Sequence, residues 1–318
     1  MCKVMPDLND LPADILRLIL SKLSCRSMLV AACTCRSMRK LVDSMPLRPV
    51  MTSQTVGMFG WMRRPDVAVR IDSFIARNCL RGKCQFLELL TNVQKLIVAY
   101  GRVTACTMAW LPSSLTYLDI HRVRCSPDDV FSLSRVSHLV NLHTLKLTFA
   151  SLWDMIVVED LAPNLRRLSI RCAPIVVVRE PLVLDSIHVH AVSRLICACP
   201  MTARHVHVEC DESELPLGDM LTPHGVARIE TLMVAGPHMV TLPHLDSMRS
   251  LRSLDVHFDS FVVNTRHLSG TLRRLLVDVQ FGVATTGHGG MSEDVDIDIH
   301  IGGVPVNKSE VRSMFFCK

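Results

Sequence analysis

A short pattern of hydrophobic positions, apolar-x-x-apolar-x-apolar, recurs along most of the chain. Its last part alternates like a short strand with one buried side. One such strand cannot bury its apolar side alone, so neighbouring units must stack over a shared core. We therefore predict an α/β solenoid over 93–284, with parallel strands on a concave inner wall. The nine units begin at Val93, Leu115, Leu142, Leu165, Leu184, Ala203, Ile229, Leu251 and Leu272.

The spacing of these units is that of a leucine-rich repeat. Successive starts lie 19 to 27 residues apart, in or beside the range of about 20–29 for that class. Segments such as LPSSLTYLDIH and LAPNLRRLSIR resemble its consensus. The family's asparagine is missing from most units, where Val123, Ala150, Ala173 and Asp259 stand at or near its position, so the subclass stays open. An ordinary α/β domain is the alternative, and the segments between strands should form short helices or irregular turns.

The two ends of the solenoid depart from the pattern. Residues 46–92 are expected to be a linker and an atypical first repeat, with an early strand at 66–72 and a helix over 74–80. Residues 285–318 should form a C-terminal cap: a turn at TTGHGG, a strand from Val295, and a closing helix after Ser309. A solenoid needs such a cap over its last exposed core.

Residues 5–45 carry a different periodicity, that of three short helices. Pro12 suits the first helical position and Asp14 the first turn. The apolar residues of the first helix cover an arc of about 200°, wider than the stripe of about 100° typical of a helix packed on one side. Because some 35 residues cannot build a sufficient core, this segment must pack against the solenoid, another protein, or both.

These helices resemble an F-box. The matching residues are the Leu11-Pro12 opening, the apolar positions of the first helix, the Met28-Leu29 pair and Cys35-Arg36-x-Met38. The chain departs from the family where Asp14 replaces Glu, Thr34 replaces Val and Met38 replaces Trp. An F-box followed by leucine-rich repeats is a recurrent arrangement, and the irregular repeats are similar to those of F-box proteins from large DNA viruses and protists.

The resemblance implies a partner. F-box proteins bind a Skp-family adaptor, which links them to a cullin–RING (SCF-type) ubiquitin ligase, and the repeats would bind a target protein. The adaptor-binding residues would then include Leu11, Pro12, Ile15, Leu16, Ile19, Leu20, Leu23, Met28 and Leu29. The alternative is a stand-alone repeat scaffold without a ligase.

Charge and cysteine content limit which kinds of partner and which cellular compartment we expect for this chain. Residues 1–90 hold 14 Lys and Arg against 7 Asp and Glu, whereas the whole chain has a net charge of +5. With few aromatic residues among the basic ones, we expect no nucleic-acid partner. No run of 18 apolar residues occurs, so no membrane span is expected. The 13 cysteines form no disulfide framework, which favours a reducing, cytoplasmic or nuclear location.

The polar positions of the predicted strands should face the concave surface and contact a target. They are Tyr117, Asp119, His121, Lys146, Arg167, Arg171, His188, His190, His205, His207, Asp255 and His257. Because neighbouring strands lie about 4.8 Å apart, His188 should adjoin His207, with His190 and His205 close by. Four imidazoles on one face leave three readings open: a metal site, pH-sensitive target binding, or ordinary half-exposed residues, of which we favour the last.

Sequence motifs for catalysis are lacking. The chain has no P-loop, dinucleotide-binding, H-E-x-x-H or G-x-S-x-G pattern. We therefore expect no enzyme activity, no cofactor and no metal, and a role in protein binding.

Overall fold

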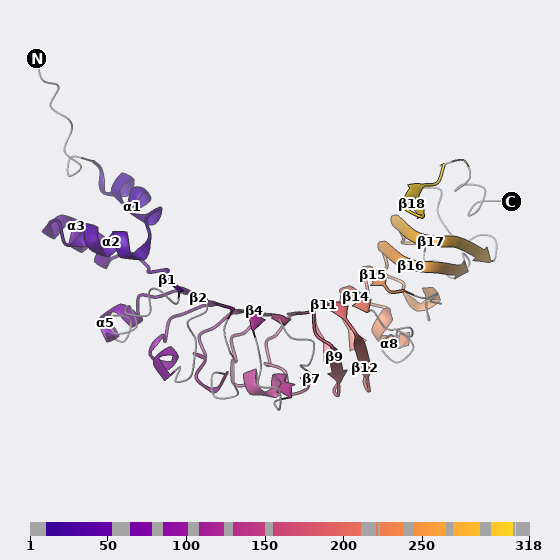
Figure 1. Ribbon diagram of the computed structural model, residues 1–318, viewed down its shortest axis with the longest axis horizontal. Coiled ribbons are helices and arrows are strands. Elements are labelled where there is room, and N and C mark those ends of the chain that lie inside the picture. The colour runs from indigo at the N-terminus through magenta and orange to yellow at the C-terminus, as the bar shows by residue number, and fades with distance from the viewer. Residues whose placement is uncertain are drawn as a thin grey trace, which may run out of the picture.

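The computed structural model describes residues 11–52, 64–77, 85–100, 108–123, 130–149, 155–210, 221, 223–237, 245–264, 270–286, 294–307 and 309. Three N-terminal helices are followed by a curved stack of repeats, with the helices at one end of the arc and β18 (Asp296–Ile301) at the other (Figure 1). The helices are α1 (Ala13–Ser21), α2 (Cys25–Ala32) and α3 (Arg36–Asp43). Short helical turns lie between strands: α5 (Pro65–Ala68), η3 (Gln85–Leu89), η4 (Leu133–Val136), α8 (Pro223–Val226) and η5 (Leu245–Ser247).

A 13-stranded sheet, counted over these residues, forms the concave wall. Every neighbouring pair is parallel except the last, where β19 turns back on β18. In spatial order the strands are β1 (Val50–Thr52), β2 (Ser73–Arg77), β3 (Lys95–Ala99), β4 (Tyr117–Val123), β6 (Thr144–Phe149), β8 (Arg167–Arg171), β11 (Ser186–Val192), β14 (His205–Cys210), β15 (Thr231–Ala235), β16 (Ser253–Asn264), β17 (Arg274–Thr286), β18 (Asp296–Ile301) and β19 (Val304–Pro305).

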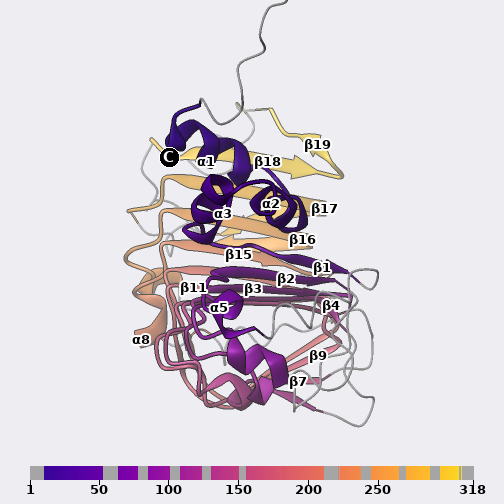
Figure 2. The ribbon, with the colours of Figure 1, turned by 90° about the vertical axis from the view of Figure 1, so that its left-hand side faces the viewer.

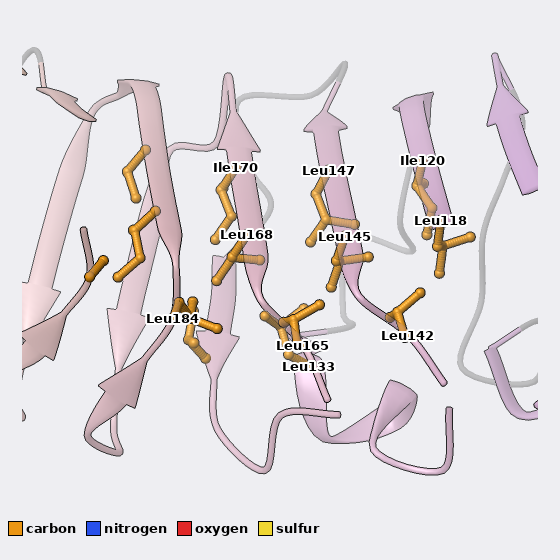
Figure 3. Close-up of a cluster of buried hydrophobic side chains, with 14 of the residues drawn as sticks. Leu118, Ile120, Leu133, Leu142, Leu145, Leu147, Leu165, Leu168, Ile170 and Leu184 are labelled. Carbon is orange, nitrogen blue, oxygen red and sulfur yellow. The ribbon is translucent and has the colours of Figure 1, made fainter. Parts of the chain in front are cut away.

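The predicted solenoid is confirmed, and its core follows the repeat pattern. Leu118, Leu145, Leu168 and Ile187 pair in register across four strands, and all are buried. Figure 3 shows such leucine and isoleucine side chains stacked in rows beneath the strands. The row continues through every predicted unit, because each strand buries the apolar face that its neighbours expose.

The outer wall differs from expectation in the middle of the stack. A second parallel sheet forms there from β5 (Phe131–Ser132), β7 (Met155–Val158), β9 (Ile175–Val178) and β12 (Arg194–Cys197), on the convex side (Figures 1 and 2). Two further strands of two residues each, β10 (Leu182–Val183) and β13 (Met201–Thr202), pair with each other in a separate small sheet. Short helices or turns were predicted, but runs such as IVVV are rich in β-branched residues, which favour strands.

The region 46–92 contributes strands to the main sheet. β1 pairs with β2, and β2 pairs with β3. The predicted strand at 66–72 was wrong, because Pro65 and Asp66 begin the helical turn α5. The helix predicted over 74–80 was wrong for 74–77, which belong to the strand Ser73–Arg77, while 78–80 lie outside the described residues. Proline at the first helical position explains the turn. Phe74 and Ala76 alternate inward, a short pattern that periodicity cannot separate from a helix.

Some neighbouring repeats are linked by polar side chains that precede a strand. Asn92, Asn141 and Asn164 donate side-chain hydrogen bonds to the carbonyl oxygens of Val69, Ser113 and Val140, at 2.7 to 3.0 Å. Each bond joins one repeat to the repeat before it. Asparagine was expected after the strands, and its position before them was not predicted.

At the C-terminal ends of β8 and β11 the chain turns through residues other than asparagine: Cys172 follows β8, and Ala191 is the second-last residue of β11. Cys172 and Ala191 adopt positive φ angles of 55° and 50°, and the following Ala173 and Val192 are buried. The left-handed residue turns the chain, and the next side chain then enters the core.

The C-terminal part extends the sheet. The predicted strand after Val295 is confirmed as β18, which pairs in parallel with β17. Thr285 and Thr286, expected in a turn, are the last residues of β17. The predicted closing helix beyond Ser309 lies outside the described residues, as does Ala150 of the expected asparagine position.

Candidate functional site

The first candidate surface is an apolar face of α1. Leu18 is 59% exposed, and Ile15, Ile19 and Leu23 are each more than 40% exposed. Val30 of α2 adds a further apolar side chain, 62% exposed. Large aliphatic side chains exposed together on one helix mark a surface that a partner can cover.

The opposite face of the helices is attached to the solenoid. Arg70, in the first repeats, ion-pairs with Asp43 at 3.2 Å and donates to the backbone carbonyls of Val42 and Met45. These groups are at the C-terminal end of α3, where a helix favours a cation. Val42 and Leu47 are fully buried, so one continuous core runs from the helices into the repeats.

The second candidate surface is a hollow of about 630 Å³ in the concave wall. Its lining comes from seven neighbouring strands of the main sheet: β4, β6, β8, β11, β14, β15 and β16. Of the predicted target-binding residues, the hollow gathers Tyr117, Lys146, Arg167, Arg171, His188, His205, His207 and Asp255. Thr231 and Met233 also line it. The repeat pattern places these two residues on the same wall, but they were not among the predicted target-binding residues.

One end of the hollow is organised around Tyr117. Its hydroxyl donates to Asp119 at 3.2 Å, and the ammonium groups of Lys95 and Lys146 lie 5.0 and 5.6 Å from its ring centre. Burial, and then the charge of Asp119, raise the pKa of Tyr117 to about 12. The ring is thus a fixed aromatic platform between two cations.

The predicted histidine cluster is present. His188 pairs with His207 across β11 and β14, with ring centres 5.5 Å apart, and the His190 ring lies 5.8 Å from that of His207. Burial and the neighbouring cationic groups lower the pKa of His188. The same causes lower the pKa of His207 to about 4. His205 contacts Thr231 at 3.3 Å.

The other predicted concave residues lie outside the hollow. The ring of His121 packs edge-on against Tyr100, with centres 6.0 Å apart. His257 faces Asp278 at 3.7 Å and lines a smaller depression nearer the C-terminus. His190 adjoins Glu209 at the margin of the hollow.

Comparison with known proteins settles the nature of the helical segment, because residues 8–49 match the F-box domain family. The chain carries an F-box domain. No curated protein matches the chain. Among solved structures, the chain is similar to an internalin (inlF) from Listeria monocytogenes, with 10% sequence identity and a TM-score of 0.46, over 90% of this chain and 93% of that chain.

The F-box residues proposed to face an adaptor fall into two groups. Ile15, Ile19, Leu23 and Pro12 are exposed on the surface of the domain, and Leu11 is half-buried. By contrast, the side chains of Leu16, Leu20 and Met28 are buried in the domain's own core. Nothing is described of the Leu29 side chain. Leu18 and Val30 were not among the predicted adaptor-binding residues, although they are more exposed than Ile15, Ile19 and Leu23.

The F-box domain also accommodates its departures from the family. Met38, at the position of the usual tryptophan, is 7% exposed and lies in the core with Val42. The flexible thioether fills space that a larger ring would occupy. Ser24 caps α2 and the Cys35 thiol caps α3, so each of these helices begins at a defined residue.

An F-box domain implies a role in SCF-type ubiquitin ligases, and the repeat solenoid suggests protein binding. F-box proteins are generally non-catalytic receptors. Within the described part of the chain, no helix has the length and apolar character needed to cross a membrane.

Proposed function

We propose that this protein is the substrate-recognition subunit of a cullin–RING (SCF-type) ubiquitin ligase. The F-box would bind a Skp-family adaptor, and through it a cullin, while the concave wall would bind a target protein. The observation that carries the proposal is the set of exposed aliphatic side chains on the F-box: Ile15, Leu18 and Ile19 of α1, Leu23 just after α1, and Val30 of α2. The solenoid leaves these side chains uncovered.

The physical argument rests on burial. Leu16 and Leu20 hold α1 to its own domain, so the exposed side chains are not needed for the core. Each large aliphatic side chain contributes about 1.5–3 kcal/mol when it leaves water. A helical adaptor with a matching groove can supply that burial.

In this role the chain performs no chemistry. It would hold the target near the ubiquitin-charged transfer enzyme, which raises the effective concentration of the target's lysines. The basic and imidazole groups of the hollow favour a target segment that is polar or acidic. The proposal places the protein in the cytosol or nucleus of its cell, in keeping with a sequence whose 13 cysteines form no spaced disulfide framework.

The decisive experiment is adaptor binding by the full-length chain. The Ile15→Glu/Ile19→Glu variant places two charges on the exposed face of α1, and we expect it to lose at least tenfold in affinity for a Skp-family adaptor. Val183→Glu is the matched control, because Val183 is 66% exposed on the outer side of the solenoid. It should bind the adaptor like the wild type.

Adaptor binding by neither the wild type nor the variants would end the ligase proposal and leave a stand-alone repeat scaffold. Equal binding by all three proteins would place the adaptor elsewhere on the chain. Affinity purification with cullin activation inhibited would then identify the retained target.

A further inference from the structure

One cluster on the concave wall has the composition of a metal site. His190, His207 and Glu209 each offer a ligand atom, and these three atoms lie within 4.8 Å of one another. The residues come from two adjacent strands, β11 and β14. None of the three is required by the F-box proposal.

The strand geometry explains why the three side chains converge. His188 lies opposite His207 and Val189 opposite Val208, but the register then shifts so that Val192 pairs with Cys210. Two residues of β11, His190 and Ala191, therefore oppose the single residue Glu209. Ala191 has a φ of 50°, and such a bulge redirects the neighbouring side chain.

The polar atoms of the cluster are incompletely satisfied. The Nδ1 atom of His190 contacts a carboxylate oxygen of Glu209. The Nε2 atom of His207 is buried and has no hydrogen-bond partner in the part of the chain described. A buried imidazole nitrogen without a partner loses free energy relative to one in water, and a bound cation would supply that partner.

We propose that His190, His207 and Glu209 bind a divalent cation of the zinc class on the concave wall. Two imidazoles and a carboxylate are a ligand set that zinc accepts, and a fourth position would stay open toward the hollow. Zinc–nitrogen bonds of about 2 Å place tetrahedral ligand atoms about 3.3 Å apart. The three atoms lie within 4.8 Å of one another, so binding would require side-chain rotations that bring them to that spacing.

The surroundings select the kind of cation. Arg171 and His257 lie near enough to His207 to lower its pKa, and Arg171 carries a positive charge. A hard cation held only by charge would be repelled there, and calcium or magnesium would find one carboxylate where they prefer several oxygens. A cation that accepts imidazole nitrogen fits better, because two of the three ligand atoms belong to histidine rings.

The test is zinc binding by chelator-treated, full-length protein. By titration calorimetry we expect one equivalent of Zn²⁺ to bind with a micromolar or lower Kd, and Glu209→Gln and His207→Gln each to weaken it at least tenfold. His300→Gln is the matched control. His300 also faces a carboxylate, that of Asp298 at 3.1 Å, but it belongs to no three-ligand group in the described structure, so its loss should leave the affinity unchanged.

Cobalt distinguishes this site from the cysteines of the chain. The Co²⁺ complex should show the visible bands of nitrogen and oxygen ligation without a thiolate charge-transfer band. Absence of binding, a thiolate band, or unchanged affinity in Glu209→Gln would each overturn the proposal.

A measurement on the wild-type protein covers the case in which a variant does not fold. Exchange of the imidazole C2 hydrogen, followed by mass spectrometry, should slow at His190 and His207 when Zn²⁺ is added, and not at His300. Equal exchange with and without zinc would overturn the proposal as well. Because adaptor binding is measured separately, the two proposals can fail independently.

Discussion

His207 shows how one side chain on a repeat strand acquires unusual chemistry. Its imidazole is flanked by His188 and His190 of β11, with Arg171 of β8 and His257 of β16 also within electrostatic reach. Burial is the first cause of its lowered pKa, and these groups add to it. The repeat brings them together because equivalent positions of successive strands stand side by side on one wall.

A stability prediction follows at this residue. The pKa of His207 falls from an ordinary value of 6.5 to about 4 in the folded chain, so the unfolded chain binds the proton more tightly. The stabilisation is therefore fully present above pH 6.5 and is lost progressively as the pH falls toward 4. His207→Gln should make the loss of unfolding free energy between pH 6.5 and pH 4 smaller by about 1 to 2 kcal/mol. This value is reduced for solvent screening, because the ring is half-exposed.

The measurement is urea unfolding at several pH values between 4 and 7.5 with chelator present. The same substitution at His143, an exposed residue just before β6, should leave the pH dependence as in the wild type. A His207→Gln protein whose stability declines as steeply as the wild type would contradict the assignment.

At the scale of elements, the junction between α3 and the first repeats decides whether the F-box is held in place. The Arg70 side chain is 19% exposed and bridges Asp43 and two backbone carbonyls. Hydrogen bonds from a charged group contribute about 1.5–3 kcal/mol each when they are well formed. The planar guanidinium reaches several acceptors at once, which an ammonium group cannot do.

We expect Arg70→Ala to lower the free energy of unfolding by about 2–3 kcal/mol, and Arg70→Lys to recover only part of this loss. Arg48→Ala is the control: Arg48 pairs with Asp72 at 3.2 Å but is 71% exposed, and such a pair contributes less than about 1 kcal/mol. Chemical denaturation of the three variants gives the comparison. Equal losses at Arg70 and Arg48 would show that the junction does not depend on this arginine.

At the scale of the whole molecule, the two candidate surfaces lie on different parts of one curved solenoid. The F-box helices occupy the N-terminal end of the arc, and the hollow lies across strands β4 to β16 in its middle and C-terminal half (Figure 1). The core that joins them is continuous. In the proposed role, this shape would hold the adaptor and the target at a fixed separation.

The two functions should therefore be separable by mutation. Lys146→Glu/Arg171→Glu reverses the charge of the hollow and should reduce target capture at least tenfold while adaptor binding is unchanged. Ile15→Glu/Ile19→Glu should show the reverse. Parallel affinity purifications of the two variants check this, and loss of both partners in either variant would mean that the surfaces are coupled.

Much of this architecture followed from the sequence alone. All nine repeat strands and the row of imidazoles were predicted, because a two-residue alternation fixes which side of a strand is buried, and the repeat fixes which strands are neighbours. The F-box helices followed from their apolar arc and motif. These are local patterns with one physical solution.

What only the tertiary structure decided lies where local patterns are ambiguous or where distant residues meet. Short alternating segments such as 66–77 fit a strand or a helical turn until the neighbouring strand β3 selects one. Which leucines of α1 face outward depends on the packing of α3 and not on the helix itself. The approach of His190 to Glu209 depends on a register shift between two strands, and that shift is set by how their buried neighbours pack.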